Sequence, residues 1–163
     1  MVTKEQRQVL MEEARRELAR RTMGDFVLYV DDNYRMNWHH RLLCDYLDKL
    51  ACKEIRRLMV FMPPRHGKSE LVSRKFPAYL LGRNPDTSII SCSYSADLAS
   101  RMNRDVQRLI DSEKYSLLFP ESHLFGKNIR LVHLNPLHPS GKGWVYFVDL
   151  NKMARGRFGR EIA

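Results

Sequence analysis

The residues best suited to chemistry are Gly67, Lys68 and Ser69, in the stretch FMPPRHGKSELV that runs from residue 61 to residue 72. A helix that begins at such a loop offers unpaired backbone N–H groups and the positive end of its dipole to an anion. Lys68 could then reach the β- and γ-phosphates of a nucleotide, and the Ser69 hydroxyl could bind Mg²⁺. The pattern therefore predicts a phosphate-binding loop.

The entry to this loop departs from the usual Walker A pattern. Met62 stands where such loops carry their first glycine, and Pro63 and Pro64 follow it. The entry must therefore be extended instead of forming a glycine-dependent turn. We interpret the stretch as a deviant Walker A; the alternative is that the Gly-Lys-Ser triplet only begins a helix. Arg65 could neutralise phosphate charge, or it could pair with a neighbouring carboxylate.

The elements around the loop are predicted from apolar periodicity. Residues 56–62 (RRLMVFM) form a short apolar run that predicts a buried strand, and the helical spacing after the loop predicts a helix over 68–82 that Pro77 kinks or divides. A β-rich run predicts a second strand over 87–94, followed by a helix capped by Ser95. This alternation is typical of an α/β protein with a parallel sheet.

Two further helices are predicted near the N-terminus. The first runs from Lys4 to Arg21, and the second follows Asn37, which is a good N-cap. Apolar residues recur at helical spacing in both segments, which indicates amphipathic helices, and the apolar face of the second is expected to lie in the core. The stripes consist of Leu10, Ala14 and Leu18 in the first helix and of Leu43, Leu47 and Leu50 in the second.

The charge of the chain favours a polyanionic partner. Its 28 basic and 19 acidic residues give a net charge of +9, and the pI is about 9.7. Nucleic acid is the leading candidate for such a partner. Arg15, Arg16, Arg20 and Arg21 would crowd one side of the first helix, where they could contact DNA or a neighbouring subunit, or form a solvated face.

Composition excludes several classes of protein. A chain of 163 residues can bury one globular core, and no apolar run approaches the roughly 20 residues of a membrane helix. The N-terminus is charged where a signal peptide would be apolar, so we expect a cytoplasmic protein without membrane association. Three cysteines without a CxxC pair indicate neither a disulfide framework nor a zinc ribbon. His133 and His138 lack a metal-ligand pattern.

The residues from 55 to 115, IRRLMVFMPPRHGKSELVSRKFPAYLLGRNPDTSIISCSYSADLASRMNRDVQRLIDSEKY, resemble the N-terminal ATPase region of the large subunit of tailed-phage terminase. The resemblance extends over about residues 20–125 and includes NWHHRLLCDYL from residue 37. It implies that ATP and Mg²⁺ are cofactors, and that Lys68 and Arg65 act on the phosphates. By resemblance, the nucleotide-binding set is His66, Gly67, Lys68, Ser69 and Glu70, and Trp38 and His39 are candidate nucleotide contacts.

The resemblance also implies a function and partners. The family comprises the ATP-driven motors that package viral DNA, so the expected partners are double-stranded DNA, the terminase small subunit and the portal protein. A full-length large subunit would form a homo-oligomeric ring in the host cytoplasm. SYSADLA, from residue 93, is similar to a segment that helps to couple hydrolysis to DNA movement; alternatively, Ser95 only caps a helix.

The likeness is expected to end near Lys127. The family pattern would continue into a strand that ends in two acidic residues, whereas here the run WVYFVDLN ends in Asp149, a candidate Mg²⁺ ligand, with Leu150 in place of a glutamate. We expect an N-terminal helical segment (1–36), a partial P-loop ATPase core (37–126) and a divergent tail (127–163). The P-loop NTPase-like parallel sheet with flanking helices would then be incomplete at its C-terminal end, as in a truncated or frame-altered chain.

Three other functions compete with a DNA-packaging ATPase. The chain could be a catalytically inactive basic module that binds DNA or other phage proteins through the arginines of its first helix. A helicase or a small-molecule kinase could carry the same loop. The sequence disfavours both of these enzymes because the likeness to the packaging family extends well beyond the loop.

Overall fold

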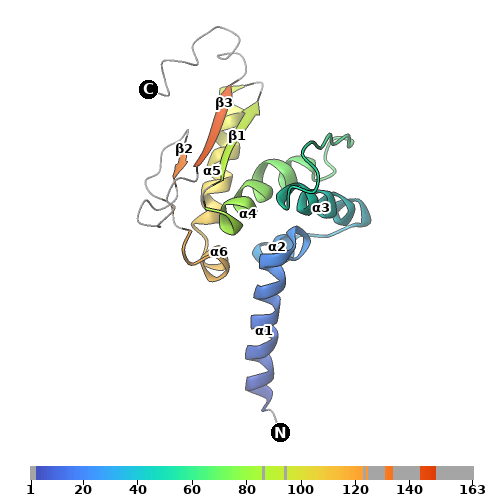
Figure 1. Ribbon diagram of the computed structural model, residues 1–163, viewed down its shortest axis with the longest axis vertical. Coiled ribbons are helices and arrows are strands. Elements are labelled where there is room, and N and C mark those ends of the chain that lie inside the picture. The colour runs from blue at the N-terminus through green and yellow to red at the C-terminus, as the bar shows by residue number, and fades with distance from the viewer. Residues whose placement is uncertain are drawn as a thin grey trace.

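The computed structural model describes residues 3–85, 87–93, 95–122, 124, 131–133 and 144–149, and these residues are mostly helical (Figure 1). Helix α1 projects from one end of the molecule, and a small sheet backed by α5 lies at the other end (Figure 1). The helices are α1 (Lys4–Arg21), α2 (Met23–Val30), α3 (Trp38–Ala51), the π-helix η1 (Glu70–Lys75), α4 (Phe76–Arg83), α5 (Ala96–Ile110) and α6 (Glu113–Leu118). The strands are β1 (Ser88–Ser93), β2 (Leu131–His133) and β3 (Trp144–Asp149).

Local capping signals explain where the N-terminal helices begin. Thr3 Oγ1 accepts a hydrogen bond from the Gln6 amide (3.2 Å), and Gln6 Oε1 accepts one from the Thr3 amide (2.9 Å), which forms a capping box. Asn37 caps α3 as predicted. Helix α2 was not predicted; it begins after Thr22, whose hydroxyl accepts a hydrogen bond from the Asp25 amide at 3.1 Å.

The apolar stripe predicted for the first helix is not buried. Leu10 and Leu18 are 57% and 50% exposed, and Ala19 is the buried residue of α1. Helix α1 packs against α2 and α6, while its N-terminal part projects into solvent (Figure 1). Periodicity locates an apolar face but does not supply a neighbour to cover it.

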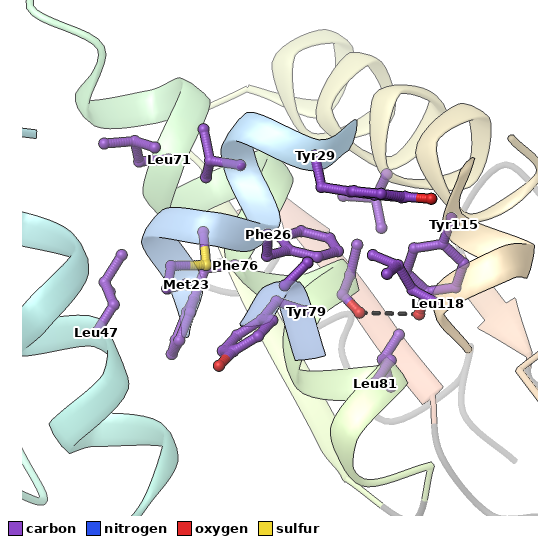
Figure 2. Close-up of a cluster of buried hydrophobic side chains, with 14 of the residues drawn as sticks. Met23, Phe26, Tyr29, Leu47, Leu71, Phe76, Tyr79, Leu81, Tyr115 and Leu118 are labelled. Carbon is purple, nitrogen blue, oxygen red and sulfur yellow. Dashed lines mark hydrogen bonds between the residues drawn. The ribbon is translucent and has the colours of Figure 1, made fainter. Parts of the chain in front are cut away.

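The core is built around α2. The Phe26 ring lies with its centroid 5.2 Å from that of Tyr79, 6.3 Å from that of Tyr115 and 6.2 Å from that of Phe119. The Tyr115 hydroxyl donates a 2.9 Å hydrogen bond to the Ala78 carbonyl, so this buried polar group is satisfied (Figure 2). This aromatic cluster joins α2, α4 and α6 into one body, against which α3 and α5 also pack.

Residues 56–62 do not form the predicted strand. Leu58, Val60 and Met62 pack partly against the core, while Met59 and Phe61 are 79% and 85% exposed, so the segment alternates as a strand would. Its backbone makes no hydrogen bonds to other described residues. The prediction was wrong because a strand also needs a neighbouring strand, and none of those described lies beside this segment.

The helix after the loop is divided at Pro77, as predicted. Lys68 and Ser69 are helical, η1 follows as a π-helix, and α4 begins at Phe76, whose amide donates to the Leu71 carbonyl. The wider turn of a π-helix accommodates a proline, which lacks an amide hydrogen and clashes with an ordinary preceding turn. Gly82 lies inside the last turn of α4, which ends at Arg83.

The three strands form a mixed sheet in the order β1-β3-β2. Strands β1 and β3 are parallel, with Ser88 opposite Trp144 and Ser93 opposite Asp149, whereas β2 is antiparallel to β3. Strand β1 and the Ser95 cap of α5 agree with the predictions. The larger parallel sheet expected for a P-loop protein is not present in the described part of the chain.

Candidate functional site

The loop from Pro63 to Gly67 has two residues in the left-handed region of backbone space. Arg65 has φ 64° and Gly67 has φ 77°. A Cβ atom at Gly67 would lie 2.8 Å from His40 Nε2 and 3.1 Å from the Tyr34 hydroxyl oxygen. Glycine is therefore required at position 67 both by the backbone angle and by the close approach of α3 and Tyr34.

Hydrogen bonds fix the shape of this loop. His66 Nδ1 donates to the Pro64 carbonyl at 2.9 Å, and His40 Nε2 donates to the His66 carbonyl at 3.2 Å. Because a carbonyl oxygen can only accept, both of these ring nitrogens carry a proton. The second bond ties the loop to the first turn of α3.

The helix begins immediately after the loop. The Leu71 amide donates to the Gly67 carbonyl at 3.0 Å, which places Lys68 and Ser69 in the first turn. Both are exposed, and neither they nor Arg65 form a hydrogen bond or an ion pair through their side chains with any described residue. Lys68 also lines a cavity of about 390 Å³ together with residues 60–63. A helix N-terminus with an unpaired ammonium and hydroxyl group is suited to binding an anion.

The Glu70 carboxylate belongs to a different part of the surface. It forms ion pairs with Arg74 and, at 3.1 Å, with Lys75. Burial acts to raise the pKa of Glu70, but the bonds from these two cations outweigh burial and lower it. Glu70 lines a second cavity of about 290 Å³ with Asp31, Asp105 and other residues. Lys68 does not line this cavity, so the Glu70 and Lys68 side chains face different parts of the surface.

Aromatic rings from α3 lie beside the loop. The Trp38 side chain is 72% exposed, and its ring centroid is 5.6 Å from that of His39. The His39 centroid lies 5.9 Å from that of His66. Burial, with the nearby His40 and His66 rings, lowers the pKa of His39, which favours its neutral form. Of the two candidate contacts predicted in α3, His39 thus lies close to the loop, and Trp38 lies against His39.

Comparison with known proteins identifies the family. Residues 59–163, more than half of the chain, match the family described as terminase large subunit, T4likevirus-type, N-terminal. The chain belongs to this family. Searches of curated proteins and of solved structures returned no match.

The family match agrees with the resemblance seen in the sequence, but it covers different residues. It begins at Met59 and therefore includes the whole loop, but not α1, α2 or α3. It also continues through residues 127–163, so the expectation that the likeness ends near Lys127 was wrong. None of the described helices of this terminase-family chain is long and apolar enough to cross a membrane.

The structure places the backbone of Asp149, the candidate Mg²⁺ ligand, in the sheet. Asp149 ends β3 beside the last residue of β1. Helix α5 packs against η1 and also against β1 and β3, so it lies between the loop helix and the sheet. Among the described residues, no group of three or more His, Cys, Asp or Glu could hold a metal ion. His133 lies in β2, and His138 lies outside the described residues.

The arginines of α1 in this terminase-family chain are largely engaged within the fold. Arg20 Nε donates to the Leu118 carbonyl at 2.7 Å, and Arg16 Nε lies 3.1 Å from the Tyr29 hydroxyl. Both contacts attach α1 to its neighbours. Among the described residues, Arg15 and Arg21, whose side chains are 60% and 70% exposed, form ion pairs only with glutamates of α1 itself. The sequence did not show that Arg16 and Arg20 are structural.

Two residues of the site were missed by the sequence analysis. Tyr34 and His40 both contact the loop, and His40 is 26 residues away from its partner His66. His40 stands three residues after the N-cap, the position from which a side chain can reach back to the cap amide. The spacing of His40 from Asn37 could therefore have indicated from the sequence that His40 contacts the cap. Tyr34 precedes the helix and had no comparable signal.

Proposed function

We propose that this chain binds ATP with Mg²⁺ through the loop at residues 63–69, as the nucleotide-binding part of a motor that packages phage DNA. The observation that carries the proposal is the position of Lys68, in the first helical turn after a tight loop, exposed and without a partner among described residues. Membership of the terminase large-subunit family supports the same function.

Each loop residue has a proposed role. Lys68 binds the β- and γ-phosphates, Ser69 binds Mg²⁺, and Arg65 neutralises phosphate charge. His66, Gly67 and Glu70 contribute backbone N–H groups. Glu70 does not offer its carboxylate, because Arg74 and Lys75 already hold it. Asp149, at the end of β3, is a candidate Mg²⁺ ligand.

Membership of the family supports a proposal for the complete sheet and for the partners. We propose that residues 58–62 become a strand of a P-loop parallel sheet when another strand pairs with them, since their burial already alternates. The proposed partners are double-stranded DNA, the terminase small subunit and the portal protein, in a homo-oligomeric ring in the host cytoplasm.

Titration with a fluorescent ATP analogue in the presence of Mg²⁺ tests the nucleotide site. Lys68→Ala is expected to weaken binding by about tenfold or more, because it removes a charge-assisted contact to phosphate. Lys4→Ala, which removes the same charge from the exposed start of α1, is the matched control and is expected to bind as the parent does. Equal affinity of the parent and Lys68→Ala would exclude the proposed site.

A basic module without ATPase activity is the second candidate. The exposed side chains of Arg15 and Arg21 and the net charge of +9 favour it. This function would be supported if neither the parent nor Lys68→Ala bound ATP while both bound DNA with the same salt dependence. Charge reversal at Arg15 and Arg21 would then weaken DNA binding.

A further inference from the structure

We propose that His40 is a positioning residue for the loop, holding it in the shape that presents its amides to phosphate. The effect of His40 on nucleotide binding rests on the proposed function, but its effect on the conformation of the loop can be tested without nucleotide. Helix α3 lies outside the family match. Through His40, this helix would control the conformation of the loop.

His40 joins the two segments through its two ring nitrogens. Nδ1 accepts a hydrogen bond from the Asn37 amide at 3.2 Å and completes the capping box of α3. Nε2 donates to the His66 carbonyl at 3.2 Å. An imidazole can accept at one nitrogen and donate at the other only in a neutral form, here with the proton on Nε2. One side chain therefore caps a helix and holds the loop.

The loop has few other attachments. The backbone of residues 58–62 makes no hydrogen bonds with described residues, so the loop is not anchored at its entry by strand pairing. The His66–Pro64 bond lies within the loop, and the Leu71–Gly67 bond belongs to the helix that follows. The Tyr34 hydroxyl lies close enough to Gly67 that an added Cβ would meet it at 3.1 Å, but it has no hydrogen-bond partner among the described residues. Among described residues, the His40 bond is thus the polar link between the loop and α3.

The loop conformation needs such a link. Arg65 is not a glycine, yet it has a φ of 64°, a conformation that persists only where surrounding contacts impose it. The His66 carbonyl that His40 binds belongs to the next residue. Loss of the bond would let residues 64–67 relax toward ordinary backbone angles and turn their amides away from a common point.

Two substitutions separate the loop contact from the cap. His40→Gln retains an oxygen that can accept from the Asn37 amide and an amide N–H that can donate to the His66 carbonyl. His40→Glu retains the acceptor but has no donor. Glu and Gln both serve at this position of a capping box, so α3 should begin normally in either variant. Only the bond to the loop differs between them.

Hydrogen exchange without nucleotide is the first measurement. In His40→Glu we expect amides of the peptide covering residues 64–72, including Leu71, to exchange about threefold to tenfold faster, as loss of one hydrogen bond implies. His40→Gln should match the parent, and the first turn of α3 should be equally protected in all three proteins. Equal loop exchange in both variants, or faster exchange confined to α3, would overturn the positioning role.

Affinity for MgATP is the second measurement. His40→Glu should bind about threefold to tenfold more weakly than His40→Gln, and the difference should persist at high salt, where repulsion by the added carboxylate is screened. A difference that vanishes at high salt would reject positioning as the cause of weaker binding. If the parent does not bind ATP but the exchange result holds, the proposed function fails while the role of His40 stands.

Discussion

The ammonium nitrogen of Lys75 lies 2.7 Å from Asp31 Oδ2, and only 4% of the Lys75 side chain is exposed. The same nitrogen is 3.1 Å from Glu70 Oε1 and 4.4 Å from the centroid of the Tyr34 ring. Lys75 therefore joins the end of α2 to the helix that follows the candidate nucleotide loop. A charge buried to this degree is tolerated only because carboxylates and a π-face compensate it.

Replacing Lys75 by Met is expected to lower the free energy of unfolding by about 2 kcal/mol, because Asp31 and Glu70 would lose their buried cation. The loss is smaller than for a fully buried pair, since these carboxylate side chains are 35% and 34% exposed. Urea denaturation measures the change. Lys114→Ala, which breaks an exposed ion pair with Asp32, is the control and should leave the midpoint unchanged. Similar midpoints for both variants would contradict a buried role for Lys75.

Acid is expected to weaken the contribution of Glu70 to stability. Its pKa in the folded protein lies below the ordinary value, so the stability it provides is fully present above about pH 5 and is lost as the pH falls through the folded value. The difference in unfolding free energy between the parent and Glu70→Gln should be largest near pH 7 and should shrink toward pH 3. Urea denaturation across this range checks the trend. A difference that grew on acidification would contradict the assigned direction.

Two glycines should respond to alanine in opposite directions. A Cβ at Gly82 would lie 2.3 Å from the Phe119 ring, which the core holds in place, so Gly82→Ala is expected to cost about 1–3 kcal/mol. At Gly24 in α2 the nearest atom would be 3.9 Å away, so Gly24→Ala should stabilise the protein by about 0.5–1 kcal/mol. Thermal and urea unfolding distinguish the signs. A double variant with Phe119→Leu should recover part of the loss at Gly82.

The sequence predicted the features that depend on neighbouring residues. Asn37 and Ser95 cap helices as expected, because a cap requires only a side chain and the amides of the next turn. The turn at Pro77 was likewise visible, since a missing amide hydrogen is a local property. Lys68 and Ser69 were placed correctly at a helix start for the same reason.

Features that depend on distant partners were missed. The segment from Leu58 to Met62 has the alternation of a strand, but pairing requires a second strand that sequence patterns do not locate. Leu10 and Leu18 of α1 are exposed for a similar reason, because no described helix or strand packs over the apolar stripe. The bond between His40 and His66 joins residues 26 positions apart and appears only in three dimensions.

The Tyr34 hydroxyl provides a final test of the site, because it is buried against Gly67 and has no hydrogen-bond partner among the described residues. Burial, with smaller effects of Cys44, Glu70 and Asp31, raises the pKa of Tyr34 to about 12. An unpaired buried hydroxyl costs free energy, so Tyr34→Phe is expected to leave stability unchanged or raise it by up to about 1 kcal/mol.

Tyr34→Leu is the informative comparison, because it removes both the hydroxyl and the ring that lies against Lys75. Tyr34→Leu should destabilise the protein by about 1–2 kcal/mol, because it loses the packing of the ring and the cation–π contact with Lys75. Tyr34→Phe keeps the ring and therefore keeps the packing and the cation–π contact. Urea denaturation separates the two variants. If Tyr34→Phe proved as unstable as Tyr34→Leu, the hydroxyl would have to be hydrogen-bonded in solution, and the contact with Gly67 would be polar. The expected order instead assigns the stabilising effect of Tyr34 to its ring, which lies against Lys75, and not to the hydroxyl beside Gly67.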